Sequence, residues 1–262
     1  MNYQNYVEQL RKNLLKFQAS GQYYPVNIDI GRSQTIEEIL RDIEECINPN
    51  YEEIADCPVG ECEGTQDFQI WEPFQEFYQA AAWIDFDWRY IGHSDLTDPP
   101  CGASDIYTIL SLYAPFEFYI PEENRMIDVL ENEMLNQPFK LSDEYRMFDR
   151  ICLDNDTHVA VKFLSNQEEP RLYYYTLKTK SYYKLSISFD EYLELLLQTM
   201  GVYYWQEFFI DDSNFRLDLA RAEQVIKDLE LLFPEVDRTI FESQLAKRRA
   251  INLGSSSQNP LS

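Results

Sequence analysis

The sequence predicts an α+β fold, in which a central, mostly antiparallel sheet packs with helices and further helices are added at the N- and C-terminal ends. Three observations indicate this fold. Residues 84–90 alternate apolar and polar side chains, as a half-buried strand does. Residues 147–187 hold successive strand patterns separated by short turns, and such turns join antiparallel neighbours because a parallel crossover needs about a dozen residues. Helical patterns with capping signals lie on both sides of these strands.

The first part of the chain is expected to be mainly helical. Residues 5–18 place apolar side chains on one helical face, and the segment 21–31 reads as a loop. Thr35 and Glu38 have the spacing of a capping box, which predicts a helix that ends before an Asn-Pro-Asn sequence. Residues 51–70 are acidic and interrupted by proline and glycine, so we expect a loop or an insertion there.

The middle of the chain combines one helix with the first strands. Pro73 stands where the first turn of a helix tolerates proline, and the strand of residues 84–90 follows that helix. A turn is expected at 98–100, where two prolines follow an aspartate. The apolar run 106–120 is expected to be rich in strands, and residues 122–135 to form a helix.

The second half of the chain predicts a meander closed by a helix. Its strands are expected at residues 150–153, 158–164, 171–177 and 182–187. The following helix has a capping box of Ser188 and Glu191, an apolar stripe at helical spacing, and Gly201 as a left-handed stop. Two further helices are expected at about 214–233 and 235–250.

These patterns divide the chain into four parts. They are an N-terminal helix and loop (1–34), an α+β domain (35–210), C-terminal helices (211–253) and a polar tail expected to be disordered (254–262).

Charge limits the partners that this chain can have. It contains 46 acidic and 22 basic residues, and its formal net charge is −24. Such a field repels nucleic-acid phosphates and anionic lipid surfaces, so neither nucleic acid nor a membrane is expected as a partner. It attracts basic proteins and speeds their encounter. The alternative, that acidity only keeps the protein soluble, stays open.

Cysteine usage and hydropathy predict a cytoplasmic protein. The five cysteines are an odd number, without the spacing of a disulfide scaffold, and no secretory signal precedes them. No segment has the roughly 18 consecutive apolar residues that a membrane span needs.

The motifs of catalysis and metal binding are missing from the sequence. Cys57 and Cys62 resemble half of a zinc site, but His93 and His158 are the only histidines and neither forms the second ligand pair. There is no Gly-x-Ser-x-Gly elbow and no glycine-rich phosphate loop. We therefore expect no catalytic, cofactor-binding or metal-binding residues, and no enzymatic activity.

A protein-binding face is the remaining candidate site. Acidic side chains on one side of the strand 84–90, acids before the last long helix and an exposed tyrosine would together suit a protein partner. The residues expected to contact it are Asp85, Asp87, Tyr174, Glu207, Asp211 and Asp212. An acidic solvated surface is the alternative for the aspartates, and core packing is favoured for Trp88 and Trp205.

Three segments together resemble the SUKH superfamily, which includes fungal cell-wall-synthesis regulators and many bacterial relatives. They are residues 73–90, 148–175 and 188–205, and the last runs from Ser-Phe-Asp-Glu-Tyr-Leu to Met-Gly-Val-Tyr-Tyr-Trp. One departure is Ala81-Ala82-Trp83, where many members carry Asn-Gly.

The resemblance implies an α+β domain with a central sheet and no catalytic residues. Bacterial members resemble immunity proteins that bind and neutralise toxins. The expected function is therefore that of an immunity protein, which occludes a cognate basic toxin. The alternative is a regulatory scaffold that recruits cellular proteins, as the fungal relatives imply.

Overall fold

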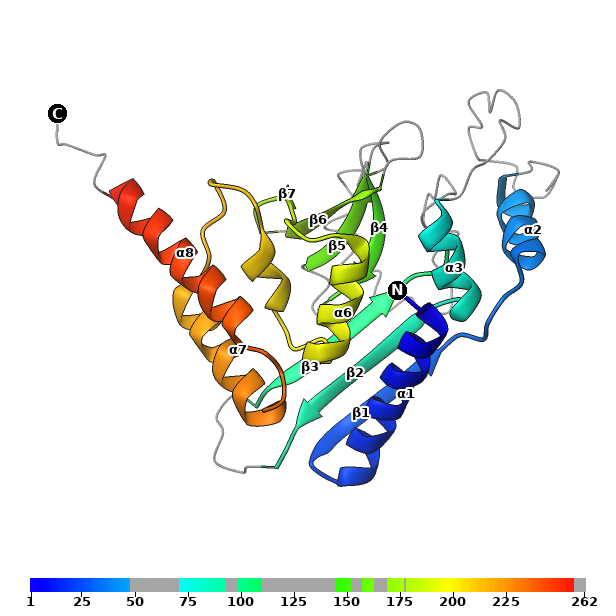
Figure 1. Ribbon diagram of the computed structural model, residues 1–262, viewed down its shortest axis with the longest axis horizontal. Helices are drawn as coiled ribbons and strands as arrows, with labels where there is room; N and C mark the ends of the chain where they lie inside the picture. Colours follow the sequence, from blue (N-terminus) through cyan, green and yellow to red (C-terminus); the bar gives the residue numbers. More distant parts are fainter. Residues whose placement is uncertain are drawn as a thin grey trace, which may run out of the picture.

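Seven antiparallel strands in sequence order form one sheet, and helices pack against it in an α+β fold (Figure 1). This computed structural model describes residues 1–47, 71–92, 99–109, 145–151, 157–162, 169–176 and 178–256. The strands are β1 (Tyr23–Ile30), β2 (Ile84–Tyr90), β3 (Cys101–Ile106), β4 (Tyr145–Arg150), β5 (Thr157–Lys162), β6 (Arg171–Thr176) and β7 (Ser181–Lys184). The predicted fold class is confirmed.

The expected loop at 21–31 is wrong, because this segment is the edge strand β1. Val26, Ile28 and Ile30 pack against the core, and the polar side chains between them are exposed. This alternation is the pattern of a half-buried strand. β1 pairs with β2 over most of its length.

Two further strands differ from the prediction. β3, from Cys101 to Ile106, lies just after the expected proline turn and was not predicted as a strand. β4 runs from Tyr145 to Arg150, so it begins five residues before the predicted strand 150–153, and its register shifts between Met147 and Asp149. This irregularity interrupts the alternation of side chains that marks a strand in the sequence. β6 begins where its strand was predicted, and β5 and β7 each begin one residue before theirs. β7 ends at Lys184, three residues before the predicted end.

The described α-helices follow the expected order, and the short helix η2 was not predicted. Their bounds are α1 (Tyr3–Ser20), α2 (Ile36–Ile47), α3 (Glu72–Ala80), α6 (Phe189–Thr199), the 3-10 helix η2 (Trp205–Phe209), α7 (Leu219–Leu232) and α8 (Thr239–Ser256). Both predicted capping boxes are present: Ser188 with Glu191, and Thr35 with Glu38. No helix in the described part of the chain is long and apolar enough to span a membrane.

Some predicted elements lie outside the described residues. These are the segment 51–70, the helix at 122–135, and most of the apolar run 106–120 and of the strand at 150–153. The last two helices begin later than expected, α7 at Leu219 and α8 at Thr239. α8 ends at Ser256, so the first three residues of the expected disordered tail are helical, while residues 257–262 lie outside the described part.

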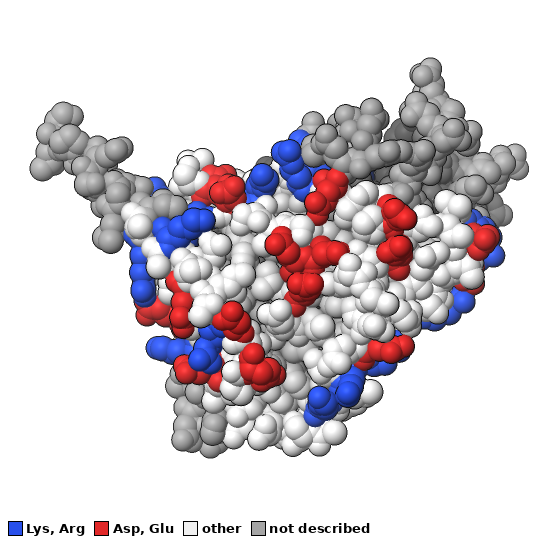
Figure 2. All heavy atoms as spheres, in the orientation of Figure 1, with Lys and Arg blue, Asp and Glu red and all other residues white. Residues whose placement is uncertain are grey.

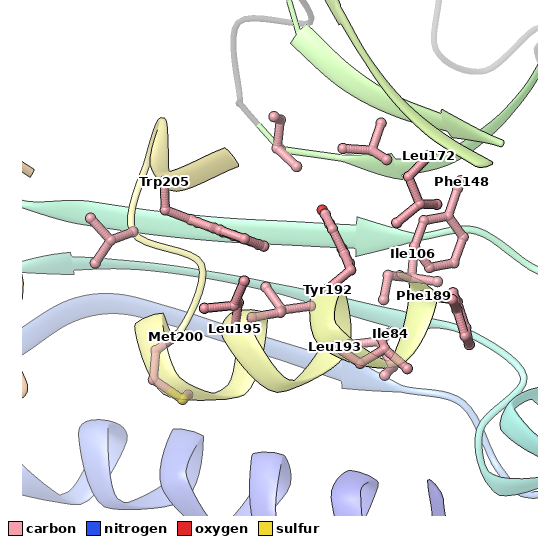
Figure 3. Packing of buried hydrophobic residues seen from close by; sticks show 14 of the residues in the cluster. Ile84, Ile106, Phe148, Leu172, Phe189, Tyr192, Leu193, Leu195, Met200 and Trp205 are labelled. Atoms are coloured by element: carbon pink, nitrogen blue, oxygen red, sulfur yellow. The ribbon is translucent and has the colours of Figure 1, made fainter. Parts of the chain in front are cut away.

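The main core lies between one side of the sheet and helices α1, α3 and α6 (Figure 1). Tyr192, Leu193 and Phe189 of α6 point into it, as Figure 3 shows. Trp88 of β2 is buried, and its indole N–H donates to the carbonyl oxygen of Met200 over 2.7 Å. Trp205 is also fully buried. The expectation of core packing for both tryptophans is confirmed.

The connection after α6 passes very close to the sheet. Met200 and Gly201 both adopt left-handed backbone conformations, so the predicted glycine stop is extended by one residue. A Cβ atom on Gly201 would lie 2.6 Å from the carbonyl oxygen of Ala103, and one on Gly102 would meet the Trp88 ring. β3 therefore carries small residues where other strands carry large apolar ones.

Candidate protein-binding face

The side of the sheet away from α1, α3 and α6 is called here the open face. On β2, Ile84, Phe86, Trp88 and Tyr90 are buried, whereas Asp85 and Arg89 are exposed and Asp87 is partly exposed. Side chains alternate between the two faces of a strand, so Asp85 and Asp87 both belong to the open face. This part of the predicted binding face is placed as expected.

One line of directly paired residues crosses all seven strands on the open face. Directly opposite residues of antiparallel strands point to the same side of a sheet. From β1 to β7 the paired residues are Asp29, Asp85, Asp105, Arg150, His158, Tyr175 and Tyr182. The contacts agree with this register, because the His158 and Tyr175 rings stack with centroids 4.5 Å apart. The line passes from acidic residues to aromatic ones.

Its first three members, Asp29, Asp85 and Asp105, are called the acid row. Like charges directly opposite one another destabilise a sheet. Partial burial raises the pKa of Asp85 to about 6, the neighbouring Asp105 carboxylate adds to that shift, and the Arg150 guanidinium opposes it. Burial also raises the pKa of Asp105, whereas the Arg150 guanidinium, 2.7 Å away, opposes this change. A cation placed over the row would relieve the repulsion.

Asp29 and Asp85 are exposed and have no hydrogen-bond or ion-pair partner among the residues that the structure describes. Neither carboxylate therefore has a structural role visible in those contacts. Asp87 differs, because its carboxylate accepts a hydrogen bond of 2.7 Å from the Asn27 amide on β1. Two unpaired carboxylates on adjacent strands are available to an external cation.

The helical side also carries acidic residues, which cluster over its middle in Figure 2. Several of them have partners within the chain. Asp190 accepts a hydrogen bond of 2.6 Å from the Tyr3 hydroxyl, and Glu191 completes the capping box of α6. Glu169 accepts a hydrogen bond from the Phe189 backbone N–H. These acids on the helical side therefore have structural partners, whereas Asp29 and Asp85 have none among the described residues.

Tyr174 and Glu207 do not belong to an exposed face, and the expectation that they contact a partner is corrected. Their relative exposures are 1% and 4%. The Tyr174 hydroxyl donates to Glu207 over 2.9 Å, and both Glu207 oxygens accept from the Arg221 guanidinium at 2.8 Å. Burial raises the pKa of Glu207, and the Arg221 charge opposes this shift. The cluster joins β6, η2 and α7 inside the protein.

Asp211 and Asp212 lie in the loop between η2 and α7, as expected. The Asp211 backbone N–H donates to the Lys184 carbonyl, and the Asp212 carboxylate accepts from the Asn214 N–H. Arg248 of α8 donates to the Asp212 carbonyl over 3.0 Å. The six predicted contact residues are thus distributed between the open face, the interior and this loop.

Sequence reasoning missed Asp29 and Asp105, which complete the acid row. A signal for Asp29 exists, because residues 26–30 alternate apolar and polar side chains like residues 84–90. Asp105 is harder to find, since Gly102, Ala103 and Ser104 precede it and give no apolar alternation.

Two further buried titratable groups are the Asp149 carboxyl in the core and the His158 imidazole in the line across the open face. Asp149 is completely buried, and it accepts hydrogen bonds from the Tyr192 and Ser104 hydroxyls and the Asp105 backbone N–H. Burial raises its pKa to about 7. His158 is 4% exposed, and burial lowers its pKa to about 4.

The described residues contain no group of three or more His, Cys, Asp or Glu side chains that could hold a metal ion. Cys57, Cys62 and His93 lie outside them. No protein family, no curated protein and no solved structure matches this chain.

Proposed function

We propose that this chain is a non-catalytic protein-binding module that neutralises a basic protein toxin, as an immunity protein does. The acid row on the open face is the proposed contact surface. The toxin would be inhibited by occlusion, because the module covers the basic surface with which the toxin holds its own substrate.

The observation that carries this proposal is the direct opposition of Asp29, Asp85 and Asp105 on three adjacent strands. Such an arrangement costs stability in the free protein, and the Arg150 guanidinium beside Asp105 offsets only part of that cost. Charged patches of this kind serve recognition by steering a partner of opposite charge and suppressing wrong partners. With spacings of about 4.8 Å between strands, the row spans about 10 Å, which matches two or three neighbouring basic side chains.

Two sequence properties support the same proposal. The net charge of −24 produces a long-range field that attracts a basic protein and repels nucleic acid. The resemblance to the SUKH superfamily implies immunity proteins among the bacterial relatives. Both observations fit an acidic inhibitor of a basic, nuclease-like toxin.

The experiment that tests this function is affinity capture from the native host with the full chain at about 50 mM salt, where surface charges are weakly screened. Native chain is compared with a variant that carries Asp29→Asn, Asp85→Asn and Asp105→Asn. A control variant carries Glu8→Gln, Glu76→Gln and Glu194→Gln, which change the net charge equally on helices α1, α3 and α6.

The proposal expects one basic protein at one-to-one stoichiometry with the native chain and the control, and its loss from the acid-row variant. Expression of the captured protein alone should arrest growth, and co-expression of the native chain should restore growth. Equal capture by all three proteins, or a captured protein without toxicity, would reject the proposed function.

A further inference from the structure

The open face carries both signs of charge, and each sign predominates on different strands. On β1–β3 it presents the acid row and Asp87, with Arg89 of β2 as a cation on the same side. On β5–β7 it presents Lys162, Arg171 and Lys184, because these residues share the parity of His158, Tyr175 and Tyr182 along their strands. Lys162 and Arg171 lie directly opposite each other, so a like-charged pair occurs in this half too.

Tyrosines accompany these basic residues. The Tyr145 ring stacks on Tyr182 with centroids 4.1 Å apart, and it meets the edge of Tyr173 at 5.0 Å. The Lys162 ammonium lies 5.1 Å from the centre of the Tyr145 ring. Tyr145, Tyr173 and Tyr182 are all partly exposed. Tyrosines of this kind, which combine a rigid apolar body with a polar end, are frequent at the energetic centre of protein interfaces.

The charge separation has a definite boundary. Arg150 pairs with Asp105 across β3 and β4, and the next residue in the line is His158. Since burial keeps His158 neutral above a pKa of about 4, it adds no charge to either half at neutral pH. The acidic half is centred on β2 and the basic half on β6, four strand spacings or about 19 Å apart.

We propose that the open face orients its basic protein partner by a two-sign charge pattern: basic side chains of the partner bind over β1–β3, and an acidic segment of the same partner binds over β5–β7 beside the tyrosines. This inference rests on the proposed function, since it assumes that the acid row receives cations. The partner is basic overall and acidic at one place.

A second copy of this chain is the competing occupant, because a face with two signs is self-complementary. Two copies, each with a net charge of −24, repel each other over the whole surface. A basic partner gains from the same field. Charge therefore favours the different protein over the second copy.

Synthetic peptides test the inference directly. The probe has four arginines, a Gly-Ser linker and four glutamates; a linker of about six residues spans about 20 Å when extended. A peptide of the same composition with alternating Arg and Glu is the control for order, and octa-arginine reports on the acid row alone. Binding to the full chain is measured by fluorescence anisotropy at about 20 mM salt.

Three proteins are compared: the native chain, the acid-row variant, and a basic-half variant with Lys162→Gln, Arg171→Gln and Lys184→Gln. A variant with Arg11→Gln, Lys12→Gln and Lys16→Gln on α1 changes the net charge equally on the helical side. The native chain should bind the block peptide about fivefold more tightly than the alternating one. The basic-half variant should lose this preference and bind octa-arginine more tightly, while the α1 variant keeps the preference.

Equal affinity for the block and alternating peptides would overturn the inference. If octa-arginine binding still depended on the acid row, the proposed function would survive that result. Octa-arginine binding that does not respond to the acid-row variant would instead remove the proposed function itself. A dimer of the native chain in sedimentation equilibrium, lost in both the acid-row and the basic-half variants, would assign the face to a second copy.

Discussion

The Tyr192 hydroxyl on α6 donates a hydrogen bond of 2.6 Å to the Asp149 carboxylate on β4, and both residues are fully buried. This hydrogen bond connects α6, which packs in the core, to strand β4 of the sheet. Gln206 of η2 donates weakly to the same hydroxyl over 3.5 Å. No ion pair with Asp149 is found among the described residues, so only hydrogen bonds compensate the burial of its carboxyl group.

Asp149→Asn should change how the free energy of unfolding depends on pH. The folded-state pKa of about 7 is above the value of an exposed aspartate, so the folded state binds the proton more tightly. The stability contributed by protonation is complete below about pH 4 and is lost as pH rises to 7. Between pH 5 and 8 the native chain should lose about 2 kcal/mol more than the variant, as measured by urea unfolding.

Tyr192→Phe is the companion variant. It removes a donor that favours the ionised carboxyl, so the pKa of Asp149 should rise further and the loss of stability should extend to higher pH. An Asn variant with the same pH slope as the native chain would show that Asp149 is ionised throughout this range.

Arg221→Met should destabilise the fold by about 2 kcal/mol, because it leaves the Glu207 carboxylate buried without its cation. The value is reduced for the partial exposure of the Arg221 side chain, 38% against 5% for Glu207. A second replacement, Glu207→Gln, should recover part of the loss. Thermal unfolding of the single and double variants measures the coupling.

The exposed pair of Glu223 and Arg249 provides the matched control. Arg249→Met should change the free energy of unfolding by no more than about 0.5 kcal/mol, because both side chains are largely solvated. Equal effects at the two sites would mean that burial of Glu207 does not determine the strength of its pair.

Gly201→Ala should be much more costly than Gly21→Ala. Both glycines have a left-handed backbone, with φ of +69° and +67°, so each alanine meets a similar conformational penalty of about 1 kcal/mol. Only at Gly201 would the new Cβ atom also lie 2.6 Å from a backbone oxygen, that of Ala103. Urea unfolding should show the difference, and similar losses would mean that β3 can move away from the α6 connection.

Asp105→Asn should lower the pKa of Asp85 from about 6, because it removes a carboxylate directly opposite on β3. In the native chain the protonated form of Asp85 stabilises the fold at low pH, and this contribution is lost as the pH rises through about 6. Carboxyl carbon shifts in an NMR titration report this pKa directly. An unchanged pKa would show that desolvation alone sets the shift, and that Asp105 does not repel Asp85.

Helices with complete end signals were predictable from the sequence, and edge elements were not. The helix capped by Ser188 and Glu191 combines a cap, an apolar stripe and a glycine stop, and all three signals agree. β1 has clear alternation only over residues 26–30, after a proline, and was mistaken for a loop. β3 carries small residues because Gly102 lies against Trp88, a tertiary contact that local patterns do not encode.

The candidate site was predictable only in part for the same reason. Alternation along β2 placed Asp85 and Asp87 on one side of their strand. Asp29 and Asp105 each lie opposite Asp85 because of the register of β1, β2 and β3. The sequence did not reveal β1 and β3 as strands. Tyr174 was misplaced because three consecutive tyrosines do not reveal which side of β6 faces the core.

The most direct test of the central claim is an NMR titration of the isotope-labelled full chain with octa-arginine, since it locates binding by residue. Backbone shifts should change first at Asp29, Asp85 and Asp105 and should disappear at about 200 mM salt, as surface charges are screened. Shifts confined to the helical side, at Asp190 and Glu194, would contradict the assignment of the open face as the site that binds a basic protein.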